Sequence, residues 1–112
     1  MAFTTEFVMG AGGAVEVEEI PVSMSGGGSG NVYPLTTVDA GTGAWVWVEG
    51  ALDPAATTLS GIPHLQVGSR TYPGIGDRIG GGGYFTGTVN VSMLSRTFAS
   101  TTFTGKVYVT RM

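Results

Sequence analysis

Few side chains of this sequence belong to types that perform acid–base, metal or nucleophilic chemistry, and none stands in a pattern that such chemistry requires. His64 is the one histidine, and the sequence has no cysteine. A transition-metal site draws on several histidine, cysteine or carboxylate ligands, and a serine nucleophile needs a histidine base and a nucleophile-elbow context that no serine has here. We therefore expect His64 to be structural and predict no catalytic residue, no metal and no cofactor.

Three glutamates and one glycine-rich stretch are the remaining catalytic candidates. Glu16, Glu18 and Glu19 are close enough to act as paired carboxylates. Glu16 and Glu18, however, share the outward face of an expected strand, whereas general acid–base catalysis calls for a concave, partly dry site. The stretch from Gly74 to Gly80 has isoleucine where a dinucleotide-binding loop needs its third glycine. Neither pattern predicts an enzyme.

Aromatic residues offer a different chemistry, because a Trp or Tyr ring on an exposed face can stack on a sugar ring. Trp45 and Trp47 are the candidate sugar platform, and two aromatic side chains on one exposed face would be its signature. Core packing accounts for most of the aromatic residues equally well. The Trp and Tyr residues concerned are Tyr33, Trp45, Trp47, Tyr72, Tyr84 and Tyr108.

Charge is divided unevenly along the chain. Residues 1–56 carry seven acidic and no basic residues, whereas residues 57–112 carry five basic and one acidic residue, so −7 and +4 give the formal net charge of −3. Asymmetry of this kind points to an interaction surface. Two interpretations stay open: strands of the two halves pair within one chain, or acidic and basic faces of neighbouring copies meet head to tail. Five scattered basic residues do not predict nucleic-acid binding.

The elements that must position these residues are strands, because apolar and polar residues alternate with period two and no helical stripe is present. Both faces of the segment with Trp45 and Trp47 are apolar, so that strand is expected to be central, sandwiched or at an interface. We predict an all-β fold, a single antiparallel β-sandwich or jelly-roll-like domain with Gly-rich loops. Strands are expected at 15–18, 45–48, 65–68, 84–91 and 106–112, with weaker candidates at 3–8, 31–38 and 96–104.

Glycine clusters predict the turns and the domain organisation. The sequence has 20 glycines and no Gly-X-Y period, and clusters at 10–13, 25–30, 41–43 and 80–83 are expected between strands. Residues 1–24 are interpreted as an N-terminal arm and first strand that pack on a neighbouring subunit, 25–30 as a Gly/Ser-rich loop and 31–112 as the sandwich core. An ordinary exposed loop at 25–30 is the alternative. The candidate subunit contacts are Phe3, Phe7, Val8, Glu16, Glu18, Arg96, Lys106 and Arg111.

Hydropathy adds two expectations about location. No run approaches the ~20 consecutive apolar residues that a membrane helix needs, and the first residues lack the basic segment of a secretory signal. We expect a protein that is made in the cytoplasm and does not insert into a membrane.

Three segments carry a resemblance to a known group of proteins. They are the start Met1–Gly10 with the Gly-rich, acidic segment after it, and the Thr/Val-rich segments Tyr84–Val91 and Val107–Thr110. In these the chain resembles the small β-rich structural proteins of tailed bacteriophages, most of all the short minor tail proteins of long-tailed actinobacterial phages. The resemblance implies a virion component without enzymatic activity that assembles symmetrically at the tail or on the capsid. It carries over no site residues.

We therefore expect a non-enzymatic structural protein of the virion, a minor tail or tail-tip component. Its expected partners are copies of itself and other virion proteins. A capsid decoration protein is one alternative. A carbohydrate-binding module that contacts a glycan on the bacterial surface is the other.

Overall fold

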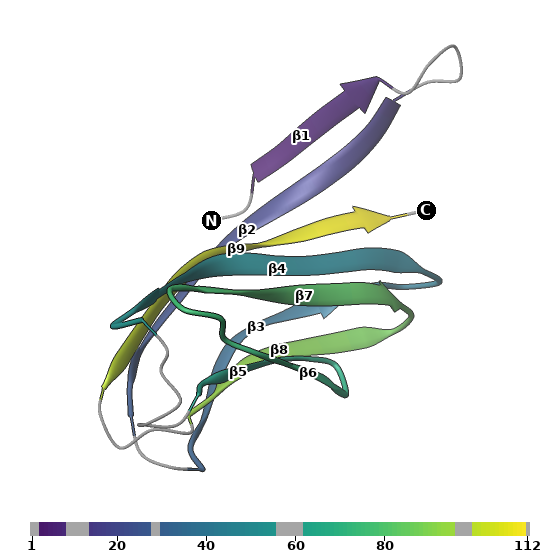
Figure 1. Ribbon diagram of the computed structural model, residues 1–112. Helices are drawn as coiled ribbons and strands as arrows, with labels where there is room; N and C mark the ends of the chain where they lie inside the picture. Colours follow the sequence, from purple (N-terminus) through teal and green to yellow (C-terminus); the bar gives the residue numbers. More distant parts are fainter. Residues whose placement is uncertain (1–2, 9–13, 28–29, 56–61, 96–99, 112) are drawn as a thin grey trace.

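The protein is built from strands joined by turns and loops in the computed structural model (Figure 1), which describes residues 3–8, 14–27, 30–55, 62–95 and 100–111, with side chains from residue 16 onward. Over these ranges it contains no helix, and so none long and apolar enough to span a membrane. The described strands are β1 (Phe3–Val8), β2 (Ala14–Gly26), β3 (Val32–Asp39), β4 (Ala44–Asp53), β5 (His64–Val67), β6 (Arg70–Pro73), β7 (Arg78–Phe85), β8 (Thr88–Leu94) and β9 (Thr101–Arg111).

The strands form two antiparallel sheets that pack as a sandwich, as the sequence predicts. The five-stranded sheet has the order β1-β2-β9-β4-β7 and the four-stranded sheet the order β3-β8-β5-β6. Segments from the two ends of the sequence pair at the centre of the larger sheet, because β9 lies between β2 and β4. The N-terminal and C-terminal halves are thus joined within one chain.

The core lies between the sheets and follows from the period-two alternation. On β4, Val46 and Val48 point inward and are fully buried, whereas Trp45 and Trp47 point outward. The strand is central in its sheet, as predicted, and its second apolar face is on the surface. The most deeply buried side chains from both sheets are Val38, Val46, Val48, Leu65, Val67, Val89, Val91, Met93, Phe103, Val107 and Val109.

The glycine cluster at 80–83 is not a turn, and that expectation is wrong. All four glycines lie inside β7, paired with β4 from Val46↔Gly83 to Glu49↔Gly80. A Cβ atom on Gly81 would collide with the Tyr72 ring, and one on Gly82 with the carbonyl oxygen of Val46. Glycine is therefore needed at these positions because β7 packs closely against Tyr72 and β4, and the four glycines do not form a turn.

The prediction of one continuous strand at 84–91 is also wrong, because this segment is the turn of a hairpin with its two flanking strands. β7 ends at Phe85 and β8 begins at Thr88. Between them Gly87 has a φ of 74°, a left-handed conformation that favours glycine. Its N–H donates to the carbonyl of Gly41 at 2.8 Å. The weaker candidate strand 96–104 overlaps the start of β9, which begins at Thr101. Residues 96–99 lie outside the described ranges.

The boundaries predicted for the arm and the loop also need correction. β2 runs to Gly26, so Ser25 and Gly26 belong to a strand, held by the register Gly26↔Thr101 with β9. Val22 is buried in the core, and Ile20 and Met24 pack against that core. The sandwich core therefore includes the second half of β2 and is not confined to 31–112.

Among the described strands, β1 and the start of β2 extend beyond the sandwich. β1 and the first part of β2 form a hairpin, paired from Phe3↔Glu19 to Val8↔Ala14. Figure 1 shows this pair, called the projecting hairpin below, reaching past the second sheet. It contributes to an elongated molecule of 50 × 23 × 23 Å.

Candidate functional site

The outer face of the five-stranded sheet holds the side chains with most scope for recognition. No other described strand covers this face, because the second sheet packs on the opposite side. Residues directly opposite one another in paired strands share a face. Three rows therefore cross β7, β4 and β9: Tyr84–Trp45–Thr110, Gly82–Trp47–Tyr108 and Gly80–Glu49–Lys106.

The first two rows form an aromatic band, defined here as Trp45, Trp47, Tyr84 and Tyr108. Trp45, Trp47 and Tyr84 are 53%, 49% and 45% exposed. The rings of Trp45 and Tyr84 meet edge to face, with centroids 5.5 Å apart and planes at 68°, an arrangement that aromatic pairs favour. The sequence predicts Trp45 and Trp47 as a pair on one exposed face if a sugar platform is present, and the structure places them so.

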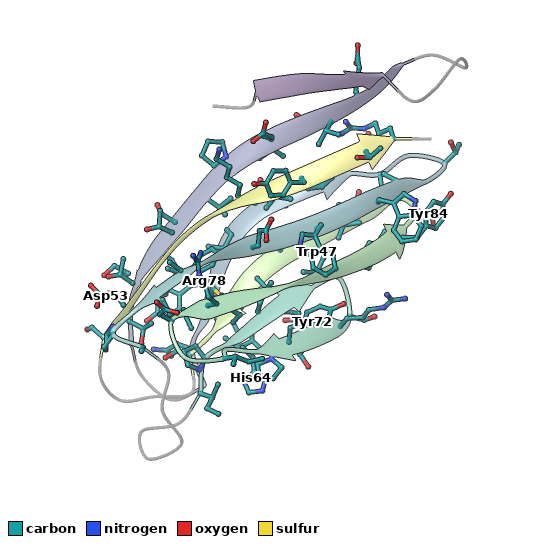
Figure 2. The ribbon with its side chains drawn as sticks, turned by 45° about the horizontal axis from the view of Figure 1, so that its top comes forward. Trp47, Asp53, His64, Tyr72, Arg78 and Tyr84 are labelled. Carbon is teal, nitrogen blue, oxygen red and sulfur yellow. The ribbon has the colours of Figure 1, made fainter. Side chains whose placement is uncertain are left out.

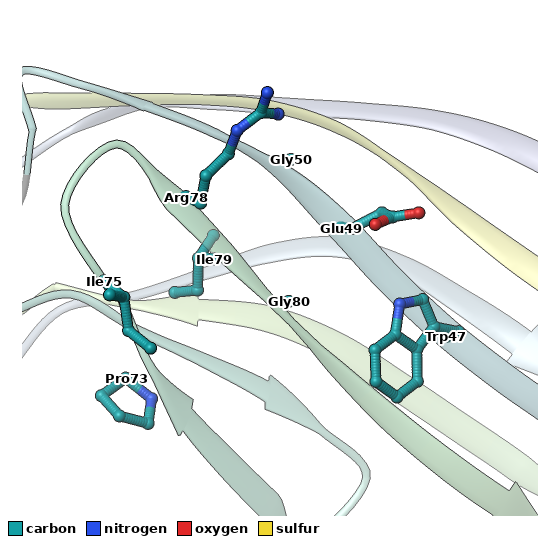
Figure 3. A pocket seen from close by; sticks show the side chains of 8 residues that line it. All are labelled: Trp47, Glu49, Gly50, Pro73, Ile75, Arg78, Ile79 and Gly80. Atoms are coloured by element: carbon teal, nitrogen blue, oxygen red, sulfur yellow. The ribbon is translucent and has the colours of Figure 1, made fainter.

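A groove opens beside Trp47, at the edge of the aromatic band (Figure 3). It encloses about 500 Å³ and is open to solvent. Gly80 and Gly50 leave its floor without side chains, while Glu49 and Arg78 are exposed on its rim. The lining residues are Trp47, Glu49, Gly50, Pro73, Ile75, Arg78, Ile79 and Gly80. Trp45 is not among them.

The groove draws on strands that only the folded chain brings together. Trp47 and Glu49 come from β4, whereas Arg78 and Gly80 come from β7. Figure 2 shows Trp47, Arg78 and Tyr84 along the same β4–β7 side of the sheet. Sequence reasoning missed Arg78, Ile75 and Gly80, because it assigned them only to a failed nucleotide loop and a turn.

Three of the predicted subunit contacts pair within the chain instead. Arg111 Nη1 lies 2.9 Å from Glu18 Oε1, and Lys106 Nζ lies 3.4 Å from Glu19 Oε1. Each pair joins β2 to β9, so an acidic residue of the first half meets a basic residue of the second. The intrachain interpretation of the charge asymmetry holds for these residues. The charges of Glu18, Lys106 and Arg111 thus have partners within the chain, and a contact of these residues with a neighbouring subunit stays a prediction.

Arg111 makes a further contact that fixes the end of β9. Its Nε and Nη2 donate to the carbonyl oxygen of Asp39 at 3.2 and 3.1 Å. Beside it, Glu16, Glu18, Val109 and Arg111 line a shallow hollow. Glu16 is exposed and stands opposite Glu6 in the strand register.

The remaining candidate contacts are placed only in part. Phe3, Phe7 and Val8 lie on β1, where the backbone register pairs them with Glu19, Val15 and Ala14; their side chains are outside the described part. Arg96 lies outside the described ranges altogether.

The described part of the chain does not bring His64 together with the glutamates that the sequence offers as catalytic candidates, since His64 and these glutamates lie on different sheets. His64 lies on β5, and its Nδ1 is 2.9 Å from the carbonyl oxygen of Ile62, a local contact. Within the described ranges, no group of three His, Cys, Asp or Glu side chains could hold a metal ion. The expectation that Glu16 and Glu18 lie on the outward face of their strand is wrong. Glu18 stands opposite the buried Val109, on the face of β2 that also carries Ile20 and Val22. Glu16 and Glu18 line a surface hollow on that face, together with the cation paired with Glu18.

Comparisons of the chain with models of protein families, with curated proteins and with solved structures find no match. Function is therefore inferred from the geometry of the outer face and of the projecting hairpin.

Proposed function

We propose that the protein is a non-enzymatic structural component of a tailed-phage virion, in the tail or tail tip, and that it assembles through contacts with copies of itself and other virion proteins. The observation that carries this proposal is the projecting hairpin, which has no second layer from the described chain to pack against. The resemblance to short minor tail proteins supplies the virion setting.

The projecting hairpin is expected to have low stability on its own, because of its strand pairing and its charges. β9 pairs with β2 only from Val17 onward, so three of the six register pairs of the hairpin, from Glu6↔Glu16 to Val8↔Ala14, have no third strand beside them. An isolated pair of strands is only marginally stable in water. Its register also sets Glu6 directly opposite Glu16, and like charges in that position destabilise a strand pair. A neighbouring subunit that covers the hairpin supplies the missing stability, because it binds only the folded form.

The edge of the hairpin has little protection against pairing. β1 is the outermost strand of its sheet, so one side of its backbone is open for pairing. Soluble proteins usually protect such an edge with charged residues, lysine above all, with proline or with a bulge, and Phe3–Val8 contains one charged residue, Glu6, and neither lysine nor proline. The alternate positions Phe3, Thr5 and Phe7 share a register face with Val15 and Val17. These features favour a strand that is covered in an assembly.

The test compares the purified protein with a hairpin variant. Light scattering is expected to find an oligomer for the parent chain and a monomer for Phe3→Ser/Phe7→Ser, with Thr4→Ser on the opposite register face as the matched control. Circular dichroism should show the same strand content in all three. A parent chain that is monomeric at every concentration, and that does not join virion particles, would overturn the proposal.

The position within the virion is part of the same test. A capsid decoration protein would use the hairpin in the same way, against shell subunits. Labelling the protein in purified particles and locating the label by electron microscopy separates the two. Label along the tail or at its tip supports our proposal, and label on the shell favours decoration.

A further inference from the structure

The groove beside Trp47 lies away from the projecting hairpin. It is built by β4 and β7, whereas β1 forms the opposite edge of the same sheet. The row Val17–Thr110–Trp45 shows that the apolar register face of the hairpin and the groove are on the same face of the sheet. An assembly whose contacts are confined to the hairpin edge leaves the groove open. A ligand bound there would be a second activity, independent of the proposed assembly role.

The floor of the groove is bare backbone. A Cβ atom on Gly80 would lie 2.8 Å from the carbonyl oxygen of Val48, and one on Gly82 would collide with that of Val46. Any other residue at these two positions would require β4 or β7 to move. The surface beside Trp47 thus stays free of side chains, which allows a flat ring to approach the sheet.

The walls offer apolar contact. Trp47 is half exposed and borders the floor, and Figure 3 shows its ring on one side of Gly80 with Pro73 and Ile75 on the other. An indole ring gains dispersion contacts with the C–H faces of a pyranose ring, while its edge stays wet. The volume of about 500 Å³ lies in the range of small-ligand sites.

The rim offers polar partners. Glu49 and Arg78 are exposed, and neither takes part in an ion pair with another described residue. A carboxylate accepts hydrogen bonds from hydroxyl groups, and a guanidinium donates them in a fixed fork. In the strand register Glu49 is two residues from Trp47 on β4, and Arg78 is four residues along β7 from Gly82, the partner of Trp47, a separation of about 13 Å. A sugar stacked on Trp47 would therefore reach Glu49, and a following sugar unit would reach Arg78.

The neighbouring sheet edge argues against an extended peptide as the ligand. A peptide that adds to β7 as a strand needs the outward backbone groups of β7. The carbonyl oxygen of Gly82 already accepts a 2.9 Å hydrogen bond from the Tyr72 hydroxyl. The middle of that edge is therefore blocked, whereas the glycine floor on the sheet face is open.

We propose that this groove binds a short oligosaccharide, with Trp47 as the stacking surface and Glu49 and Arg78 as hydrogen-bonding partners of its hydroxyl groups. Saccharide binding by the groove goes beyond the structural role and is argued from the groove alone. The choice of a glycan of the bacterial surface as its source rests on the proposed function.

The experiment is isothermal titration calorimetry of the full chain with three probes: tetrasaccharides of N-acetylglucosamine, glucose and mannose. Trp47→Ala is the test variant, and Trp45→Ala is the matched control, because it removes an equally exposed ring of the same strand face that does not line the groove. Glu49→Gln and Arg78→Gln test the rim. Urea unfolding of each variant checks the fold.

We expect at least one probe to bind, Trp47→Ala to weaken binding by about tenfold or more, Arg78→Gln and Glu49→Gln to weaken it less, and Trp45→Ala to leave it unchanged. Equal losses in Trp45→Ala and Trp47→Ala would overturn the groove as the site. Binding to none of the probes would overturn the saccharide proposal, while the oligomer measurement would still decide the structural role.

Discussion

Tyr72 of the four-stranded sheet and Gly82 of the five-stranded sheet are joined by a hydrogen bond: the Tyr72 hydroxyl donates to the Gly82 carbonyl oxygen at 2.9 Å. The same ring fills the space beside Gly81, where a Cβ atom would collide with it. One tyrosine thus packs against a glycine strand and caps its open edge. It links the two sheets where β6 leads into β7.

This contact predicts that Gly81→Ala is destabilising. The added methyl group meets the Tyr72 ring between the sheets, and overpacking of this kind costs about 1–3 kcal/mol. Urea unfolding of the parent chain and the variant measures the loss. In the background of Tyr72→Ala the same substitution should cost less, because the ring that it meets is gone. An equal cost in both backgrounds would show that the two residues are not coupled.

Replacing a large side chain by alanine should lower the free energy of unfolding more on the inner face of the larger sheet than on its outer face. Phe103 is fully buried, so Phe103→Ala is expected to cost about 3–5 kcal/mol. Trp47→Ala removes a larger side chain that is already half exposed, and the expected loss is below about 1.5 kcal/mol. Urea midpoints of the two variants test this order. A larger loss for Trp47→Ala would mean that the aromatic band is packed more tightly than described.

The two ion pairs between β2 and β9 should contribute unequally to stability. Lys106 and Glu19 form an exposed pair at 3.4 Å, and such pairs contribute about 0–1 kcal/mol. Arg111 also donates twice to the carbonyl of Asp39, and an ammonium group cannot reproduce that fork. Arg111→Lys should therefore lower the thermal midpoint more than Lys106→Met. An equal effect of the two substitutions would contradict the importance of the Asp39 contact.

Hydrogen exchange should separate the projecting hairpin from the sandwich. In a monomer, amides of β1 are expected to exchange much faster than those of β4 and β9, because β1 pairs on one side only and lacks a second layer. In the oligomer the amides of β1 should become protected. Mass spectrometry after deuterium labelling at low and high protein concentration provides the measurement. Unchanged protection of β1 upon assembly would exclude the hairpin as the contact.

Local alternation was sufficient to predict the fold class and to place Trp45 and Trp47 on one face of their strand. The pattern Trp45-Val46-Trp47-Val48 has period two, so one pair had to face the core and the other had to face away. It does not say which pair is buried, because both are apolar. The smaller valines fit between the sheets, and the structure buries them.

The glycine strand could not be predicted in this way. A run of glycines carries no alternation, and turns are its most common setting. Gly80 to Gly83 form a strand because β4 pairs with them and Tyr72 fills the space left by Gly81. Both partners are distant in sequence or on another sheet. The groove was missed for the same reason, since Arg78 and Trp47 become neighbours only through that pairing.

The position of β9 in the larger sheet has a consequence for when the chain can fold during its synthesis. β9 is the last described strand in the sequence, yet it lies between β2 and β4 and pairs with both. During synthesis the ribosome releases β2 and β4 long before β9 is available to join them. The larger sheet therefore cannot close before β9 has left the ribosome, and these long-range pairings should make folding slow compared with a helical domain of equal size. A copy interrupted before residue 101 would lack the strand that joins β2 to β4, so the last described strand is also a check that the sheet is complete.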